Sequence, residues 1–366
     1  MKINILLPFR EKFDLNKASS VSITVKNNIH HSKYIPHIKI FGQSVDNPLF
    51  KENFQGIKYS FLSLKSKNSF IAEEMYKIIL KSCHKKQLIE IHNRPYLAKQ
   101  IFNKSKKFPI TLFFHNDPKT MKGSKSVLER EKILLKCAGV FCVSEFIKKQ
   151  FLDGIKNDFG KVHVLYNGVD RRLRKIPSKK KEVLFVGRLV YEKGAHIYTD
   201  VVSSVAKKFP EWTFGLIGSS ILGNNNNKNF YARNIEEKFK NIGNQAKFYG
   251  FKNHEFVQNK MKDASIIIIP SLWEEPFGLV AAEAMSNGIS IIASKVGGIP
   301  EIIGENGILI ENVDSLKIEK SLRELLVDKK KRENLQRKSW TNFILSSKKS
   351  SKKLDCFRKI ILEKYY

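Results

Sequence analysis

Short, mostly apolar runs alternate with longer helical patterns from one end of the chain to the other. Each run is bounded by polar segments, which is typical of strands buried on both faces of a parallel sheet. The runs in the first half are Ile3–Leu7, Leu88–Ile91, Ile110–Phe114, Gly139–Val143 and Val162–Leu165. The runs in the second half are Val183–Val186, Thr213–Ile217, Ala246–Tyr249, Ile266–Ile269 and Ser290–Ala293. With helical patterns such as Ala195–Lys207 and Glu255–Lys262 between them, they predict an α/β protein.

The alternation breaks near residues 167–178, where a polar, basic stretch follows the turn signal Asn167-Gly168-Val169-Asp170. A chain of 366 residues is long enough for two domains with separate cores. We therefore expect two Rossmann-like, doubly wound domains, residues 1–166 and 167–349, that face each other across a cleft. Residues 350–366 are expected to form a basic amphipathic helix that packs back on the first domain rather than anchoring to a membrane. The polar tract Asn224–Asn227 is expected to be a loop.

The charge balance favours anionic partners. The chain has 66 Lys and Arg against 35 Asp and Glu, a formal charge of +31. An anionic membrane surface and nucleic acid both fit this excess, and so does a compositional bias, because the lysines are spread from end to end. No zinc-finger or RNA-recognition motif is present, so nucleic acid is not expected. Four cysteines without metal-site spacing, no signal peptide and no long apolar stretch predict a cytoplasmic protein, with any membrane contact peripheral and at the inner face.

Two glutamates, Glu275 and Glu283, follow the predicted strand that ends at Ile269. Pro276 suits the first turn of a helix, and Gly278 permits close approach of a ligand to the backbone. On a continuous helix the two carboxylates would lie about 80° apart around the axis and about 12 Å along it, which suits the two ends of an extended ligand. A diphosphate between them would meet the N–H groups at the helix start. An ordinary helix with two exposed glutamates is the alternative on spacing alone.

Five ordered motifs resemble those of the retaining glycosyltransferases of family 4, which have the GT-B fold. The stretch Glu275–Glu283 resembles the E-x7-E element of that family. The other motifs are Phe141-Cys142-Val143-Ser144-Glu145, Tyr166-Asn167-Gly168-Val169-Asp170, Phe185-Val186-Gly187-Arg188-Leu189 followed by Glu192-Lys193-Gly194, and Val296-Gly297-Gly298-Ile299-Pro300-Glu301. Their match covers about residues 85–310. The resemblance implies the GT-B arrangement of two Rossmann-like domains, with the second domain binding the nucleotide-sugar donor.

The resemblance also implies roles for individual residues. Arg188 and Lys193 would bind the diphosphate, where two cations can neutralise the charge of the leaving group. Glu275 would hold hydroxyls of the donor sugar and Glu283 those of the ribose. His115 would lie beside the reacting sugar. The candidate catalytic residues are therefore His115, Glu275, Arg188 and Lys193, and the further donor-binding residues are Glu283, Gly187, Phe277, Gly278, Leu279 and Val280.

Acceptor-side candidates come from the first domain. His92 and Arg94 follow the predicted strand Leu88–Ile91, so they are expected at the ligand-binding edge of the sheet. The family usually has a pair of glycines in the loop after its first strand, whereas this loop has none. Lys17 and Ser19 are the candidates to replace that contact.

The predicted function is that of a retaining hexosyltransferase, which moves a sugar from a nucleoside-diphosphate sugar to a glycan or lipid-linked acceptor. The resemblance places it in lipopolysaccharide, capsule or other cell-surface polysaccharide synthesis. No Asp-x-Asp occurs in the chain, so neither a metal nor a cofactor is expected. A nucleotide-sugar epimerase of the same architecture and a basic nucleic-acid-binding protein are the alternatives.

Overall fold

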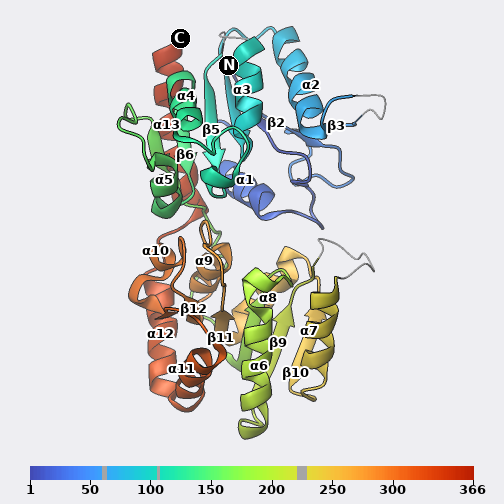
Figure 1. Cartoon of the computed structure of the whole chain (residues 1–366), viewed down its shortest axis with the longest axis vertical. Helices are drawn as coiled ribbons and strands as arrows, with labels where there is room; N and C mark the ends of the chain where they lie inside the picture. Colours follow the sequence, from blue (N-terminus) through green and yellow to red (C-terminus); the bar gives the residue numbers. More distant parts are fainter. Residues whose placement is uncertain (60–63, 105–107, 221–228) are drawn as a thin grey trace. The chain divides into compact units, whose positions relative to one another are not determined.

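The computed structural model describes residues 1–59, 64–104, 108–220 and 229–366, and the predicted loop Asn224–Asn227 lies outside them. The chain forms two α/β units, Met1–Gly168 with Leu345–Tyr366, and Val169–Ile344 (Figure 1). Each unit has its own core of buried aliphatic and aromatic side chains. The predicted α/β architecture is confirmed.

The first unit is built on a seven-stranded, fully parallel sheet with the order β3-β2-β1-β4-β5-β6-β7. Its strands are β1 (Lys2–Leu6), β2 (Ile38–Gln43), β3 (Phe54–Ile57), β4 (Gln87–His92), β5 (Ile110–Phe114), β6 (Gly139–Cys142) and β7 (Val162–Val164). Its helices are α1 (Ser20–His30), α2 (Lys67–Lys81), α3 (Pro95–Lys104), α4 (Val127–Lys136), α5 (Glu145–Leu152) and α13 (Ser347–Tyr365). The apolar runs predicted five of these strands. They missed β2 and β3, each of which contains a glycine and lies towards the sheet edge.

The second unit has a six-stranded parallel sheet with the order β10-β9-β8-β11-β12-β13. Its strands are β8 (Lys180–Val186), β9 (Thr213–Ile217), β10 (Ala246–Gly250), β11 (Ala264–Ile269), β12 (Ser290–Ser294) and β13 (Ile308–Ile310). Its helices are α6 (Ala195–Val205), α7 (Phe230–Lys240), α8 (His254–Asp263), α9 (Leu279–Ser286), α10 (Ile299–Ile303), α11 (Ser315–Val327) and α12 (Lys329–Thr341). Only β13, a three-residue strand, has no counterpart among the predicted runs.

Each sheet contains a point where the strand order reverses. In the first unit β1 pairs with both β2 and β4, and in the second β8 pairs with both β9 and β11. At such a point the loops that follow the two central strands leave in opposite directions and open a crevice at the carboxyl edge of the sheet. The topology therefore predicts ligand-binding residues in the loops after β1 and β4, and in those after β8 and β11.

Helix α13 joins the end of the chain to the first unit (Figure 1). Its apolar side chains Leu354, Ile361 and Leu362 are buried in the same cluster as Ile3 and Ile5 of β1. Most of its lysines lie on the opposite, exposed face. No helix in the described parts of the chain combines the length and the apolar character that a membrane crossing requires.

Candidate active site

In the second unit, two loops at the reversal point lie directly on each other. Gly194, which follows β8 and has a left-handed backbone (φ +69°), packs so tightly that a Cβ there would lie 2.0 Å from the carbonyl oxygen of Pro270. The Leu272 N–H donates a hydrogen bond of 2.8 Å to the Glu192 carbonyl. The contact needs glycine at position 194, because any side chain would separate the loops. It brings Lys193 to the segment that follows β11.

Lys193 and Glu275 form an ion pair within these loops. Glu275 is 7% exposed, and its Oε1 also accepts a hydrogen bond of 2.7 Å from the Ser271 hydroxyl. The Lys193 ammonium lies 5.3 Å from the centroid of the Trp273 ring. Both bonds to Glu275 fall on Oε1, so among the described residues Oε2 has no hydrogen-bond partner. A buried carboxylate with one oxygen anchored can offer the other to a ligand hydroxyl.

The neighbouring Glu274 has a structural role. Its carboxylate accepts a hydrogen bond from the Gly297 N–H, and the Glu275 carbonyl accepts one of 2.7 Å from the Gly298 N–H. Gly297 has φ +55°, and a Cβ there would lie 2.2 Å from the Glu275 carbonyl oxygen. The glycine pair after β12 therefore holds the backbone of Glu275 in place. Of the two adjacent glutamates, Glu274 supports the loop and Glu275 is the candidate ligand-binding residue.

The helix after this loop begins later than the proline predicts. Helix α9 starts at Leu279, with Gly278 as its N-cap at φ +95°, so the expectation of a helix from Pro276 is wrong. The left-handed backbone of Gly278 interrupts the helical path, and Phe277 turns into the core at 3% exposed. The N-cap Gly278 has no side chain to cap α9. The N–H groups at the helix start, which carry the positive end of the helix dipole, are therefore not used by a capping side chain. Leu279 and Val280 occupy the first two positions there.

Glu283 lies one turn into α9 and is 5% exposed. Its Oε1 lies 2.7 Å from Nε2 of His254, the first residue of α8. Gln258 and Asn287 extend the same network, because the Asn287 amide donates to the Gln258 side chain and to the Glu283 carbonyl. With both carboxylates buried, the alternative of two exposed glutamates on an ordinary helix is wrong. His254 was missed in the sequence; its place at the first turn after β10, at the carboxyl edge, is the signal that could have found it.

Arg188 follows β8 and is exposed, and it forms no ion pair within the described parts of the chain. Gly187 beside it packs against the loop after β9, where a Cβ on Gly218 would lie 1.8 Å from the Gly187 carbonyl oxygen. The Gly187 N–H donates a hydrogen bond of 3.1 Å to the Ile217 carbonyl. The loop is therefore fixed while the Arg188 guanidinium stays accessible to an anion.

In the first unit, His92 and His115 meet at the ends of β4 and β5. Nδ1 of His92 lies 2.8 Å from Nε2 of His115, and both rings are buried. The Asn93 side chain accepts a hydrogen bond of 3.2 Å from the His115 N–H, which fixes the backbone at that strand end. Asn93 itself adopts φ +56°, a conformation that asparagine tolerates better than most residues. His92, predicted to face the acceptor, thus faces His115.

Burial keeps this histidine pair neutral. It lowers the pKa of His115 to about 4, and it lowers that of His92 well below the usual 6.5, with His115 and Arg358 adding to the effect. At neutral pH, His115 is therefore suited to hydrogen bonding rather than to carrying a positive charge. Because one ring nitrogen of His115 is bonded to His92, its Nδ1 is the atom left for a ligand.

The stability of the first unit should fall with acidification through this pair. Between pH 6.5 and 4 the unfolded chain binds a proton at position 115 that the folded chain does not, so stability decreases as the pH falls. For His115 alone, the loss between pH 7 and pH 5 should be about 2 kcal/mol. Urea unfolding of wild type and His115→Gln at both pH values measures it. The variant should lose about 2 kcal/mol less than wild type; equal losses would contradict the lowered pKa.

The other first-unit candidates lie near the end of β1. Ser19 caps α1, with its hydroxyl accepting a hydrogen bond from the Ser22 N–H. The pKa of Glu11 is raised by burial, while a hydrogen bond with Ser19 and the charge of Arg94 act in the opposite direction. Glu11, which was missed in the sequence, therefore lies near both Ser19 and Arg94. Lys17 is exposed, and its backbone N–H donates to Asp14.

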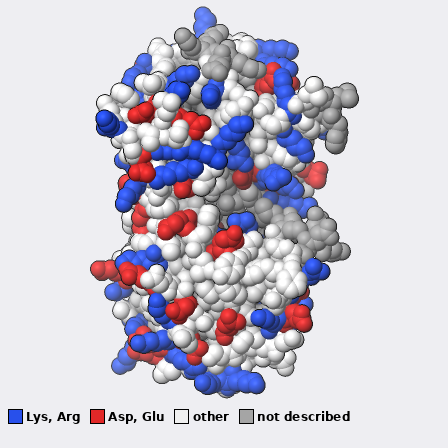
Figure 2. Space-filling view, in the orientation of Figure 1, with Lys and Arg blue, Asp and Glu red and all other residues white. Residues whose placement is uncertain are grey.

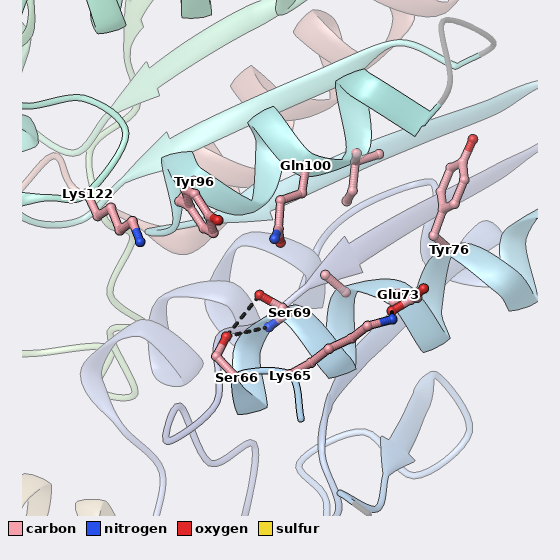
Figure 3. Close-up of a pocket in the computed structure, with 10 residues that line it drawn as sticks. Lys65, Ser66, Ser69, Glu73, Tyr76, Tyr96, Gln100 and Lys122 are labelled. Carbon is pink, nitrogen blue, oxygen red and sulfur yellow. Dashed lines mark hydrogen bonds and ion pairs between the residues drawn. The ribbon is translucent and has the colours of Figure 1, made fainter. Parts of the chain in front are cut away.

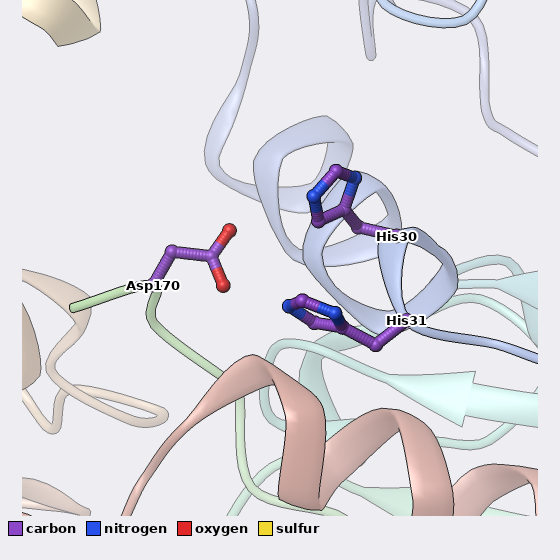
Figure 4. Close-up of side chains that lie close together, drawn as sticks. All are labelled: His30, His31 and Asp170. Carbon is purple, nitrogen blue, oxygen red and sulfur yellow. The ribbon is translucent and has the colours of Figure 1, made fainter. Parts of the chain in front are cut away.

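Two more histidines, His30 and His31, end α1, with their ring centroids 4.7 Å apart (Figure 4). Figure 4 also draws Asp170, which belongs to the second unit.

Family models match both parts of the chain. The model described as Glycosyltransferase Family 4 matches residues 37–173, and the one described as Glycosyl transferases group 1 matches residues 169–340. An uncharacterized glycosyltransferase of Methanocaldococcus jannaschii is 30% identical over 54% of this chain, and the match spans about half, 52%, of that relative's length. An uncharacterized protein from the cps region of Klebsiella pneumoniae is 26% identical over 81% of this chain and 84% of its own.

Solved structures share the fold at lower identity. The Anabaena protein HepE, solved in complex with UDP and glucose, superposes with a TM-score of 0.78 at 17% identity. The superposition covers 98% of this chain and 99% of that chain. At this identity the likeness establishes the fold, and it agrees with the two parallel sheets described above.

Proposed function

The chain belongs to the group 1 glycosyltransferases of family 4, and we propose that it transfers a hexosyl group from a nucleoside-diphosphate sugar to a glycan or lipid-linked acceptor. The observation that carries the proposal is the buried Glu275, ion-paired with Lys193, at the carboxyl edge of the second sheet. Arg188 and the uncapped start of α9 belong to the same unit. The cations and helix amides suit a diphosphate, and the carboxylate suits sugar hydroxyls.

In this proposal each group has a separate task. Lys193 and Arg188 neutralise the negative charge that develops on the departing diphosphate, Arg188 as a fork of donors and Lys193 as a point charge. The amides of Leu279 and Val280 add the positive end of a helix. Oε2 of Glu275 accepts hydroxyls of the sugar. Glu283 holds the ribose hydroxyls, with His254 fixing the orientation of its carboxylate.

We propose that transfer retains the anomeric configuration and needs no metal or cofactor. Two cations and the helix amides supply the charge that a divalent ion supplies in other transferases. His115 stays neutral and donates a hydrogen bond. Transfer should therefore continue in EDTA. The comparisons do not favour the epimerase or the nucleic-acid alternative.

UDP binding tests the donor half directly, because HepE was solved with UDP. We expect Arg188→Ala and Lys193→Met each to weaken UDP binding about tenfold or more, the loss of one charged hydrogen bond, in calorimetric titration at low salt. Lys207→Met, an exposed lysine of the same unit, is the control and should leave binding unchanged. The titration is repeated with GDP and ADP, and the tightest nucleotide is used to compare variants. If none binds, or if both variants bind as wild type does, the proposed donor site is wrong.

For the acceptor we propose a lipid-linked or cell-surface polysaccharide intermediate at the inner face of the membrane, in lipopolysaccharide or capsule synthesis. The relative from a cps region supports this setting. The exposed face of α13 supports peripheral contact, because it carries Lys348, Lys349, Lys352, Lys353, Lys359 and Lys364 while its apolar face is buried. On the face in Figure 2, Lys and Arg side chains lie on both units with Asp and Glu among them, so the charge alone does not define a contact surface.

Vesicle flotation tests the membrane proposal. The chain should float with vesicles containing anionic phospholipid, and it should dissociate as salt rises, because each lysine near the surface contributes about 1 kcal/mol. Replacing Lys348, Lys352 and Lys359 with Gln should reduce flotation, whereas replacing the exposed Lys329 and Lys330 and the partly exposed Lys331 of α12 should not. Equal flotation with neutral vesicles, or no flotation, would contradict the proposal.

A further inference from the structure

A groove runs between α2 and α3 on the first unit, with a cavity volume of about 590 Å³ (Figure 3). Side chains from both helices point into it, and Lys122 reaches it from the loop after β5. This volume lies within the range of small-molecule sites. None of the site residues discussed above lines it.

The groove offers hydrogen-bonding groups that the protein itself does not use. Tyr76 of α2 is only 6% exposed, yet its hydroxyl has no hydrogen-bond partner among the described residues. The Tyr96 hydroxyl and the Gln100 amide on α3 likewise have none there. Two aromatic rings with polar tips and a primary amide are the groups that sugar rings and their hydroxyls engage. Polar groups that the protein leaves unbonded at the surface of a groove can hydrogen-bond a ligand.

The groove also carries a cation without a carboxylate partner. Lys122 places its ammonium 4.4 Å from the centroid of the Tyr96 ring and forms no ion pair with a described residue. Gly123 next to it has φ +95°, and a Cβ there would lie 2.9 Å from the Tyr96 backbone nitrogen. The glycine therefore lets this loop lie against the start of α3 and holds Lys122 over the groove. Lys65, at the opposite wall, is paired with Glu73, so Lys122 supplies the net charge.

The groove lies close to the histidine pair of the first unit. Tyr96 lies in the first turn of α3, two residues after Arg94, and α3 begins just after β4, where His92 meets His115. The groove thus leads away from the carboxyl edge of the first sheet, along the helices. A ligand that extends from this edge along α3 would place an acidic or phosphorylated sugar ring beside Lys122.

We propose that this groove binds a negatively charged saccharide unit of the acceptor, a sugar bearing a phosphate or a carboxylate. The inference rests on the proposed transferase function and adds the chemical class of the acceptor. Tyr76, Tyr96 and Gln100 engage the ring and its hydroxyls, and Lys122 pairs with the anion.

Calorimetric titration of the full chain with four probes tests the proposal: glucose 6-phosphate, glucuronic acid, glucose and inorganic phosphate. The two anionic sugars should bind at least about fivefold more tightly than glucose or phosphate. Lys122→Met should weaken both about fivefold, and Tyr76→Phe, which keeps the ring and the packing, should do the same. Lys125→Met, an exposed lysine of the same loop outside the groove, should bind as wild type does.

Different outcomes of these titrations would contradict different parts of the proposal. Equal affinity for glucose and glucose 6-phosphate would remove the charge requirement, and equal affinity for phosphate and glucose 6-phosphate would reduce the site to a simple anion site. Binding that is lost in Lys193→Met but kept in Lys122→Met would place the sugar phosphate in the donor half and overturn the inference. UDP titration of the same variants keeps the two proposals apart. If UDP does not bind but the anionic sugars still bind and lose affinity in Lys122→Met, only the proposed donor site is wrong.

Discussion

Glu275→Gln should lower turnover about 100-fold while leaving the fold intact. The change removes the charge from a buried carboxylate whose Oε1 is held by Lys193 and Ser271 and whose Oε2 is free among the described residues. A hydrogen bond to a charged group contributes about 1.5–3 kcal/mol, and Oε2 would make such bonds to the sugar as charge develops on it. The measurement is release of nucleoside diphosphate under saturating donor, using the donor that a screen identifies.

Glu274→Gln is the matched control, because it changes the adjacent carboxylate, which accepts the Gly297 N–H instead. It should alter turnover less than about threefold, since a Gln side chain can still accept that hydrogen bond. Circular dichroism and thermal unfolding of both variants report whether the loop is preserved. Unchanged turnover in Glu275→Gln, with a donor that wild type uses, would remove Glu275 from the site and with it the central assignment.

The second large effect is on stability. Arg358→Met should destabilise the first unit by about 3–5 kcal/mol, the cost of leaving a buried charge without its partner. Arg358 on α13 donates two hydrogen bonds of 2.8 Å to the carboxylate of Glu90 in β4, and both side chains are 1% exposed. Asp355 and Ser32 complete the cluster, so the end of the chain is bound to the central strand of the first sheet. Urea unfolding followed by probes specific to each unit is the measurement, because the two units need not unfold together.

Two further variants test whether the loss of stability comes from the buried pair of Arg358 and Glu90. Arg323→Met in α11 breaks a more exposed pair with Glu319 and should cost less than about 1 kcal/mol. The double change Arg358→Met with Glu90→Met should recover part of the loss, since it removes both charges of this buried pair. A loss below about 1 kcal/mol in Arg358→Met, or an effect on the second unit instead, would show that α13 does not hold the first unit together.

Much of the fold could be predicted from the sequence, because the patterns that indicate strands and helices lie within a few consecutive residues. A run such as Ile266–Ile269 is fully apolar, so it can only be stable with both faces covered, and β11 has that environment. The strands that were missed are short or contain glycine, as in β2, where Gly42 interrupts the pattern. The start of α9 was misplaced because Pro276 is compatible with a first turn, whereas Gly278 has a left-handed backbone and the helix begins only after it.

The segment Glu275–Glu283 shows which features of the candidate site could not be predicted from the sequence. Spacing and motif order selected these two glutamates, Lys193 and Arg188 as a set, and they identified the family. Only the tertiary structure buries both carboxylates, pairs Glu275 with Lys193 and places His254 against Glu283. The same holds for the His92–His115 pair and for the open hydroxyl of Tyr76 in its groove. The physical reason is that periodicity and turn chemistry act over a few residues, whereas burial, pKa and unpaired polar groups depend on neighbours that are distant in the chain.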